Sequence, residues 1–516
     1  MAAELRRQMP RSDSRRGLTD LESWGLSALV CAVAFAWLLS LSSALEHWFV
    51  VPTFACGVVI GKDAVDWARA RLGTLDPAAV LGLFGWHFFF LSPLLTAYYG
   101  QALFWWAITP PRDWRDWLGY LAIANFAGLF VYRLSRSAAL RWRASARSSI
   151  VWVLDRRRFW WLWALLVVAC SIFVVLVFRK VGGYVGYAAA RAFTPQTRTE
   201  HPLYGMGWMT TFAERLPMIL WLGFVVYLSG RARRPTWWAI GAGLVVLFAL
   251  QLAIAGPRGS RSAVMFTVIE AVIMVHYVLR PVSRRIIMAG LAATVAFVYY
   301  YGFYKAAGLA GLEALRSPGA RAEITTETGR GVQKVLIDDL SRAGIQSYLI
   351  YRVTRPTSDY DYAFGRSYLA ALSQPVPRSI WPDKPPAKHY ETAVVLFGRP
   401  FADTGGLSHK VLGLAGEALL NFSPLAIPLA FVVPGVLVAA VRRWGATWRR
   451  DDARMLLMGM LVPLAVRVVH GDSSNLTTFF ARYGVTVLPL ILLSVHRVRM
   501  RSAAADSEGT AEEQSA

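Results

Sequence analysis

Charged residues are scarce in this chain: they make up 17% of its 516 positions, whereas 55% are hydrophobic. Together with a mean hydropathy of +0.40, this composition excludes an ordinary soluble domain and is typical of a polytopic membrane protein. Acidic residues are scarcer than basic ones, 32 against 55, and the net charge is +23. The arginines stand in short clusters between apolar runs rather than along one polar face, so they do not indicate nucleic acid binding.

Residues and motifs for metals, nucleotides and disulfides are also few. The three cysteines, Cys31, Cys56 and Cys170, lie inside apolar runs and lack the paired spacing of a zinc site or a disulfide framework. The eight histidines are scattered, with no H-E-x-x-H pattern, and there is neither a Walker GxxxxGK[ST] loop nor a recognisable Ser/His/Asp motif. We therefore expect no metal and no cofactor.

The two ends of the chain differ from its apolar body. The basic segment 1–22 leads into a span too long for a signal-peptide core and has no small-residue cleavage site, so the first helix is expected to be an uncleaved anchor. The segment 496–516 ends in small, polar and acidic residues and is expected to be a disordered tail.

Apolar runs predict an all-α protein of about twelve membrane-spanning helices. Each run is close to the ~20 residues needed to cross a hydrocarbon core, although two are shorter or interrupted. The ten full runs lie at about 23–44, 78–100, 114–132, 159–178, 236–255, 263–280, 286–304, 424–441, 454–470 and 476–495, and the two short ones at about 48–61 and 216–229.

The basic clusters predict the orientation, because short cytoplasmic loops are enriched in Lys and Arg. A cytoplasmic N-terminus places every strongly basic cluster, at 132–158, 231–235, 280–285, 441–454 and 496–501, on the cytoplasmic side. Both termini are then cytoplasmic. The domain order becomes spans 1–9 in 23–304, a long extracytoplasmic loop in 305–410, and spans 10–12 in 411–495.

The long loop has more residues than a connection needs, and such loops are usually functional. Its segment 331–353 has apolar residues at helical spacing, which predicts an amphipathic helix against the membrane or the mouth of the bundle. The region 348–381 is rich in aromatic residues, which suit either the faces of sugar rings or an interfacial belt at the headgroups.

Ionisable groups from five segments are predicted at one outer level of the membrane. They are Glu214, Arg215, Arg258, Arg261, Glu417, Arg467, His470, Asp472 and Arg482. Charges within spans tend to mark sites, and the planar guanidinium suits a diphosphate, although a single arginine at this depth can also serve lipid phosphates. Glu417 is a candidate general base or one half of a salt bridge, and His409 is the second candidate for the proton transfer.

The stretch "FGRSYLAALSQPVPRSIWPDKP", followed by "GGLSHKVLGLAGEALLNF", resembles the Wzy-type O-antigen polymerases, a family of oligosaccharide repeat-unit polymerases. In that family an outer loop carries a Gly-x-Ser-Tyr start and a Pro-Arg-x-x-Trp-Pro-x-Lys-Pro core. A Gly-Glu-x-x-x-Asn-Phe stretch then opens the next helix. The matching residues are Gly365, Ser367, Tyr368, Pro377, Arg378, Trp381, Pro382, Lys384, Pro385, Gly416, Glu417, Asn421 and Phe422. The family often has Gly after the Asn-Phe pair, where this chain has Ser423 and Pro424.

The resemblance implies a C-type glycosyltransferase-like fold in the bacterial plasma (inner) membrane. The expected reaction moves a growing glycan from a polyprenyl diphosphate to a new lipid-linked repeat unit on the outer leaflet. The implied partners are polyprenyl-diphosphate-linked oligosaccharides, membrane lipids, and chain-length regulator and flippase proteins, with no nucleic acid. The expected residues are Arg258, Arg261, Arg378, Lys384 and Arg482 for the diphosphate, Trp381, Tyr368 and Asn421 for the glycan, and Glu417 and His409 for catalysis.

The sequence is also compatible with three other functions. A ligase that moves the finished glycan to another acceptor would share the diphosphate site. A transferase that uses dolichol-phosphate sugars would usually have paired acids in the first outer loop, where this chain offers only Glu46. A transporter or flippase would place its polar residues near the membrane midplane rather than at the outer side.

Overall fold

The computed structural model describes residues 14–100, 111–142, 150–189, 203, 206–257, 261–329, 331–355, 358, 360–376, 380–398, 400, 403 and 410–499. The chain divides into two compact units. Unit 1 comprises Met1–Ala139, Ser283–Ala439 and Val462–Ala481, and unit 2 comprises Leu140–Val282, Ala440–Leu461 and Arg482–Ala516. Each unit is described by itself below.

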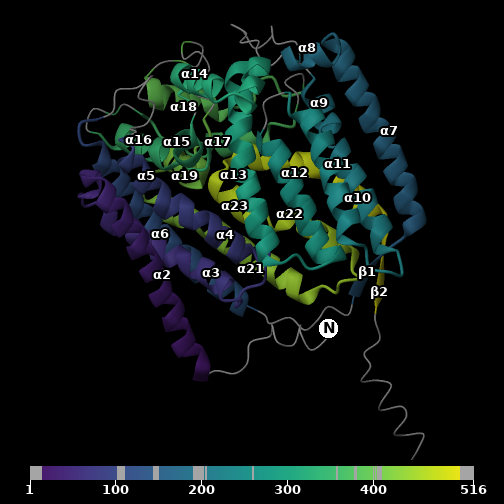
Figure 1. Ribbon diagram of the computed structural model, residues 1–516, viewed down its shortest axis with the longest axis horizontal. Helices are drawn as coiled ribbons and strands as arrows, with labels where there is room; N and C mark the ends of the chain where they lie inside the picture. The colour runs from purple at the N-terminus through teal and green to yellow at the C-terminus, as the bar shows by residue number, and fades with distance from the viewer. Residues whose placement is uncertain are drawn as a thin grey trace, which may run out of the picture. The chain divides into compact units, whose positions relative to one another are not determined.

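Unit 1 is built from helices of very different lengths, among which α2, α3 and α4 pack side by side (Figure 1). Three of its helices, α6, α21 and α24, end in segments that belong to unit 2. Its elements are α2 (Ser14–Leu41), η1 (Ser43–Leu45), α3 (Val50–Ala68), α4 (Pro77–Trp86), η2 (His87–Leu91), α5 (Ser92–Tyr98), α6 (Trp114–Arg141), α13 (Arg284–Ala307), η5 (Gly308–Leu315), α14 (Pro318–Thr328), α15 (Val332–Lys334), η6 (Val335–Asp339), α16 (Ala343–Thr354), α17 (Arg366–Leu372), α18 (Lys388–Phe397), α19 (Gly413–Asn421), α20 (Ala426–Ala430), α21 (Val432–Thr447), α23 (Leu464–His470) and α24 (Ser473–Gly484).

Unit 2 is a second helical bundle, in which α7 packs on α9 and α10, and α11 packs on α10 and α12. Two short strands complete it. Its elements are β1 (Ile150–Leu154), α7 (Arg156–Lys180), α8 (Gly183–Ala189), α9 (Gly207–Ala213), α10 (Leu216–Ser229), α11 (Trp237–Ala255), α12 (Arg261–Met274), η4 (Val275–Leu279), η8 (Ala453–Leu457), α22 (Met458–Leu461), α25 (Val487–Leu493) and β2 (Val495–Arg499).

Side-chain caps fix where several helices begin. The carboxylate of Asp76 accepts a hydrogen bond from the Ala78 backbone N–H at 2.8 Å, and Pro77 occupies the first helical position of α4, where no backbone donor is needed. Thr236 caps α11 and Ser283 caps α13 in the same way, through their hydroxyl oxygens. These polar residues stand directly before apolar runs, so the chain changes from loop to spanning helix within one turn.

Eleven helices in the described part of the chain are long and apolar enough to cross a membrane, which makes the protein an all-α, multi-pass membrane protein. They coincide with eleven of the twelve predicted spans. The remaining prediction, 48–61, falls in α3, a helix of 19 residues that continues to Ala68. Its last turns carry three charged residues, Lys62, Asp63 and Asp66, and all three are buried.

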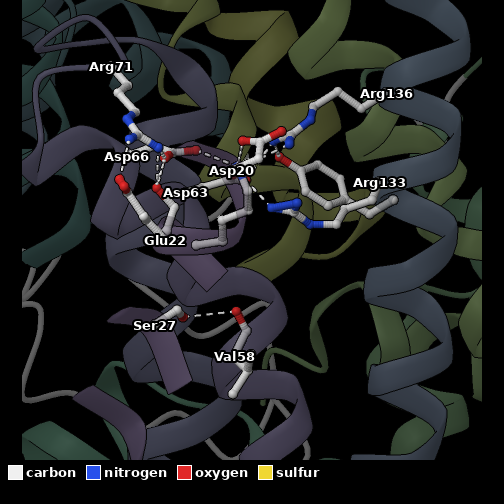
Figure 2. Close-up of polar contacts among 12 residues, drawn as sticks. Asp20, Glu22, Ser27, Val58, Asp63, Asp66, Arg71, Arg133 and Arg136 are labelled. Atoms are coloured by element: carbon white, nitrogen blue, oxygen red, sulfur yellow. Dashed lines mark hydrogen bonds and ion pairs between the residues drawn. The ribbon is translucent and has the colours of Figure 1, made fainter. Parts of the chain in front are cut away.

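Ion pairs inside unit 1 neutralise the charges of α3, as Figure 2 shows. Asp63, whose exposed fraction is 2%, lies 2.6 Å from Arg136 and 3.1 Å from Arg133, both on α6. Lys62 contacts Asp66 at 2.7 Å within the same helix. Burial of a charge is tolerated only when it is paired and hydrogen-bonded, so these pairs account for a polar end on an otherwise apolar helix.

The predicted helix over 331–353 is interrupted, which corrects the expectation of one continuous amphipathic helix. The chain forms α15 and η6 up to Asp339, breaks at 340–342, and resumes as α16 at Ala343. The residues from Ala343 to Ile350 are all buried, so α16 is part of the core of unit 1 rather than a helix lying on its surface. Small and polar residues such as Gly344, Gln346 and Ser347 allow this close packing on every side.

The predicted C-terminal tail begins with an ordered strand in unit 2, which corrects the expectation of disorder from 496 onward. β2 pairs antiparallel with β1, with Ile150 opposite Arg499 and Leu154 opposite Val495. Two of the basic segments that were predicted to share one side of the membrane, 132–158 and 496–501, are therefore joined by a strand pair. Residues 500–516 lie outside the described part.

Candidate functional site

The two ends of the motif-bearing segment meet in unit 1. The Ser367 hydroxyl, on α17, donates to Glu417 Oε1 on α19 at 2.8 Å, and Asn421 Nδ2 donates to Ser367 Oγ at 2.7 Å. The Ser367 hydroxyl thus links Glu417 and Asn421, which lie one turn apart on α19. They are 50 and 54 residues from Ser367 in the sequence. Because all three residues are buried, these bonds are shielded from water.

Asn421 has every polar atom of its side chain engaged. Its amide nitrogen also donates to the Glu417 carbonyl oxygen at 2.8 Å, and its oxygen accepts from the Gly365 backbone N–H at 2.9 Å. It holds the turn before α17 against the end of α19. Both amide hydrogens are used, so a glycan hydroxyl could only donate to Oδ1, and Asn421 is fully buried.

The carboxylate of Glu417, whose exposed fraction is 2%, also reaches the start of α24. Its Oε2 accepts from the Ser473 backbone N–H at 2.6 Å, and its Oε1 accepts from the Ser473 hydroxyl. The neighbouring Asp472 forms a buried ion pair with Lys388, the first residue of α18. Lys388 also donates to the Lys410 carbonyl oxygen at 3.0 Å. This polar cluster, which we call the Glu417 cluster, joins α17, α18, α19 and α24.

Burial raises the pKa of Glu417 above its ordinary value, and the negative charge of Asp472 raises it further. The hydrogen bonds from Ser473 and the charge of Lys388 act in the opposite direction but are weaker. The pKa of Tyr368 is also raised, first by burial and then by the charge of Glu417. The cluster is therefore a place where a carboxyl accepts a proton more readily than it does in water.

We expect the Glu417→Gln variant to change how stability depends on pH. The folded-state pKa lies above the ordinary 4.5, so folding favours the protonated carboxyl. This stabilisation is complete below the unfolded-state pKa and is lost as the pH rises through the folded-state pKa. The stability of the wild type should thus fall relative to that of Glu417→Gln as the pH increases from about 4.5.

Thermal unfolding in detergent between about pH 4 and pH 8 measures this difference. Glu323→Gln is the matched control, since Glu323 is an exposed carboxylate on α14. A difference between wild type and Glu417→Gln that stays constant with pH, or that favours the wild type at higher pH, would contradict the assignment.

A second polar group lies inside unit 2 and includes Glu214, Arg215 and Arg482, which were predicted at the outer level. Arg482 forms an ion pair with the buried Glu214 at 3.1 Å, and the Tyr483 hydroxyl donates to the buried Glu270. The guanidinium of Arg215 lies 5.6 Å from the centre of the Tyr483 ring. Segments that are more than two hundred residues apart in sequence thus bring two arginines and two carboxylates together.

Arg215 is unusual within this group because it is 4% exposed, and its Nε and Nη1 atoms have no hydrogen-bond partner among the described residues. A buried donor without an acceptor costs about 1–3 kcal/mol, and more when the group is charged. The contact with the Tyr483 ring offsets part of this cost, at most about 2 kcal/mol. Such a guanidinium has donors available for an anion.

The other predicted site residues are distributed as follows. Arg258, Arg378 and His409 lie outside the described residues. Arg261 begins α12 of unit 2 and is half-buried, whereas Trp381 is exposed in unit 1. The remaining two take part in the packing of α17: Tyr368 stacks on Phe422 with ring centres 6.3 Å apart, and Lys384 Nζ donates to the carbonyl oxygens of Ser373 and Val376 at 3.3 and 2.7 Å.

Sequence reasoning missed Lys388 and Ser473, and it gave Arg215 no role of its own. Lys388 stands in the proline-rich segment after Trp381, but its partner Asp472 is 84 positions away. The contact of Ser473 with Glu417 could not be predicted from the residue type, since it uses a backbone N–H. Arg215 was predicted at the outer level beside Glu214. Nothing in the sequence shows that its donors are unpaired whereas Arg482 pairs with Glu214.

No group of three or more His, Cys, Asp or Glu side chains suited to a metal ion lies among the described residues. Comparison with protein-family models, with curated proteins and with solved structures gave no match to this chain.

Proposed function

We propose that this protein is a membrane glycosyltransferase that joins polyprenyl-diphosphate-linked oligosaccharide repeat units into a surface polysaccharide. The supporting observation is the Glu417 cluster, in which the residues that carry the resemblance at one end of the segment 364–422 bond directly to those at the other end. A shared hydrogen-bond network gives a physical reason for these residue types to occur together. The membrane-spanning helices suit a substrate with a lipid carrier.

The reaction needs an acceptor hydroxyl, a leaving diphosphate and a group that takes one proton. The hydroxyl oxygen attacks the anomeric carbon of the donor glycan, and the bond from that carbon to the diphosphate oxygen breaks. The polyprenyl diphosphate leaves with the bonding electron pair, and guanidinium groups that bind the diphosphate stabilise its negative charge. No nucleotide is required, because the donor already carries its leaving group.

Glu417 is the candidate for the proton. Its raised pKa favours proton acceptance, and its Oε2 accepts only the bond from Ser473 N–H, which leaves one acceptor position. Because Glu417 is buried, the acceptor hydroxyl must enter the interior of unit 1 to reach this oxygen. Glu417→Gln preserves the size of the side chain and removes its basicity, so chain extension should be lost while the protein remains in the membrane.

A deletion strain tests the proposal, with surface and lipid-linked glycan analysed by electrophoresis. Loss of the polymerase leaves single repeat units on the acceptor in place of a ladder. Full-length polymer that remains on its lipid carrier would identify a ligase, and the absence of repeat units from the outer leaflet would identify a flippase. Either of these two results would contradict the proposal.

We propose that the two unpaired donors of Arg215, in unit 2, bind an anionic group of the lipid-linked substrate, and Arg215→Met tests this assignment. The substitution removes a buried charge with two unsatisfied donors and fills its volume, so thermal stability should stay equal or rise. Chain extension should nevertheless be abolished. Unfolding temperature and glycan electrophoresis measure the two effects. A Met variant that still makes full-length polymer would exclude Arg215 from substrate binding, and one that is strongly destabilised would show a structural role.

A further inference from the structure

In unit 1, α17 packs on α19 (Figure 1). Several apolar side chains on and next to α17 are exposed. The exposed fraction is 73% for Phe364, 72% for Leu372 and 82% for Leu425, and Leu369 and Phe422 are also exposed. We call these five residues the α17 patch. Exposed apolar side chains that gather in this way mark an interaction surface, whereas single ones need no explanation.

Contacts through Asn421 and Tyr368 connect three of the patch residues, Phe364, Phe422 and Leu372. Phe364 N–H donates to the Asn421 carbonyl oxygen at 2.8 Å, which sets Phe364 beside the chain that continues into Phe422. Phe422 stacks on Tyr368, and Leu372 follows Tyr368 by one helical turn on the same face of α17.

The backbone holds Phe364 in an uncommon conformation. Its φ is 41°, in the left-handed region that a bulky residue rarely adopts, and the next residue, Gly365, has φ 89°. The bonds to Asn421 maintain this turn, although the side chain of Phe364 itself points away from the core and is mostly exposed. Strain of this kind persists where the surrounding structure fixes it, and it is commonly found at functional positions.

The α17 patch continues a stripe along the span that begins at Ala426. Leu429, Val433 and Val436 are exposed at helical spacing after Leu425, as expected for the face of a spanning helix that meets lipid tails. The patch extends this face beyond the end of the span into the loop.

We propose that the α17 patch lies in the bilayer, with Phe364 and Leu372 in contact with phospholipid acyl chains. Continuity with the lipid-facing stripe favours lipid over a protein partner. The side chains of the patch offer no hydrogen-bond donor or acceptor, which disfavours a glycan. α17 is thereby an interfacial anchor that fixes the depth of the loop. This inference is independent of the proposed enzymatic function.

Quenching of a fluorophore at single positions tests the location. Phe364→Cys and Leu372→Cys are labelled with an environment-sensitive dye and placed in phospholipid discs that hold one protein and no polyprenyl lipid. Glu323→Cys on α14 is the matched exposed control. The native cysteines Cys31, Cys56 and Cys170 are buried, and wild type treated with the dye gives the background.

A phospholipid with a nitroxide near the top of its acyl chain should quench the dye at both patch positions several-fold more than at the control. Aqueous iodide should quench it several-fold less. Iodide quenching equal to that of the control would overturn the proposal. Protection from iodide without quenching by the nitroxide lipid would also overturn it, because the patch would then be covered by protein.

Discussion

The Lys388→Met variant should lose about 3–5 kcal/mol of stability, because it leaves the carboxyl group of Asp472 inside unit 1 without the cation that now pairs with it. The side chain of Asp472 is fully buried. The double variant Lys388→Met/Asp472→Leu removes both charges, so it should recover much of this loss. Unfolding temperature, read from the monodisperse fraction that remains in detergent after heating, measures the effect.

Arg366→Met is the matched control for this prediction. Arg366 also forms an ion pair, with Glu391 of α18, at 2.9 Å, but half of its side chain is exposed. Exposed pairs contribute about 0–1 kcal/mol. If Lys388→Met were no more destabilised than Arg366→Met, the buried pair would not be a main attachment of the loop to the spanning helices.

The Asp63→Leu variant should be destabilised by about 3–5 kcal/mol, since it leaves two arginines of α6 without their carboxylate (Figure 2). Arg136→Met should cost more than Arg133→Met, because Arg136 makes the shorter contact with Asp63 and also donates to the Tyr132 hydroxyl at 2.7 Å. Unfolding temperatures of the three variants give the order.

Glu22→Gln serves as the control in the same region, since Glu22 pairs with Arg69 at an exposed position and its loss should have little effect. Equal unfolding temperatures for Asp63→Leu and Glu22→Gln would contradict the account of α3 as a helix whose charges are neutralised inside the protein.

The spanning helices were predictable because an apolar run of sufficient length has few alternatives to a membrane helix. The charged end of α3 could not be interpreted in this way. Lys62, Asp63 and Asp66 make the run look short, and only the structure shows that α6 supplies the arginines. The break after Asp339 was equally hidden, since apolar spacing continues on both sides of it.

The pairing of the candidate site residues was not predictable from the sequence. Topology placed Glu214 and Arg482 at one level, and the two side chains do form an ion pair. Pairing depends on how each helix is rotated about its axis, which the run of apolar residues does not specify. The bond from Ser367 to Glu417 had a weak signal in the motif, whereas the contact from Ser473 uses a backbone N–H that any residue would provide.

Reconstitution of the purified protein with lipid-linked repeat units tests the proposed function most directly. Vesicles that contain the protein and a polyprenyl-diphosphate-linked oligosaccharide, with no nucleotide added, should form glycans of several repeat units and release polyprenyl diphosphate. Vesicles with Glu417→Gln should contain only the starting material. The proposed polymerase activity would be contradicted if the wild-type protein left the substrate at a single repeat unit while its unfolding temperature showed that it is folded.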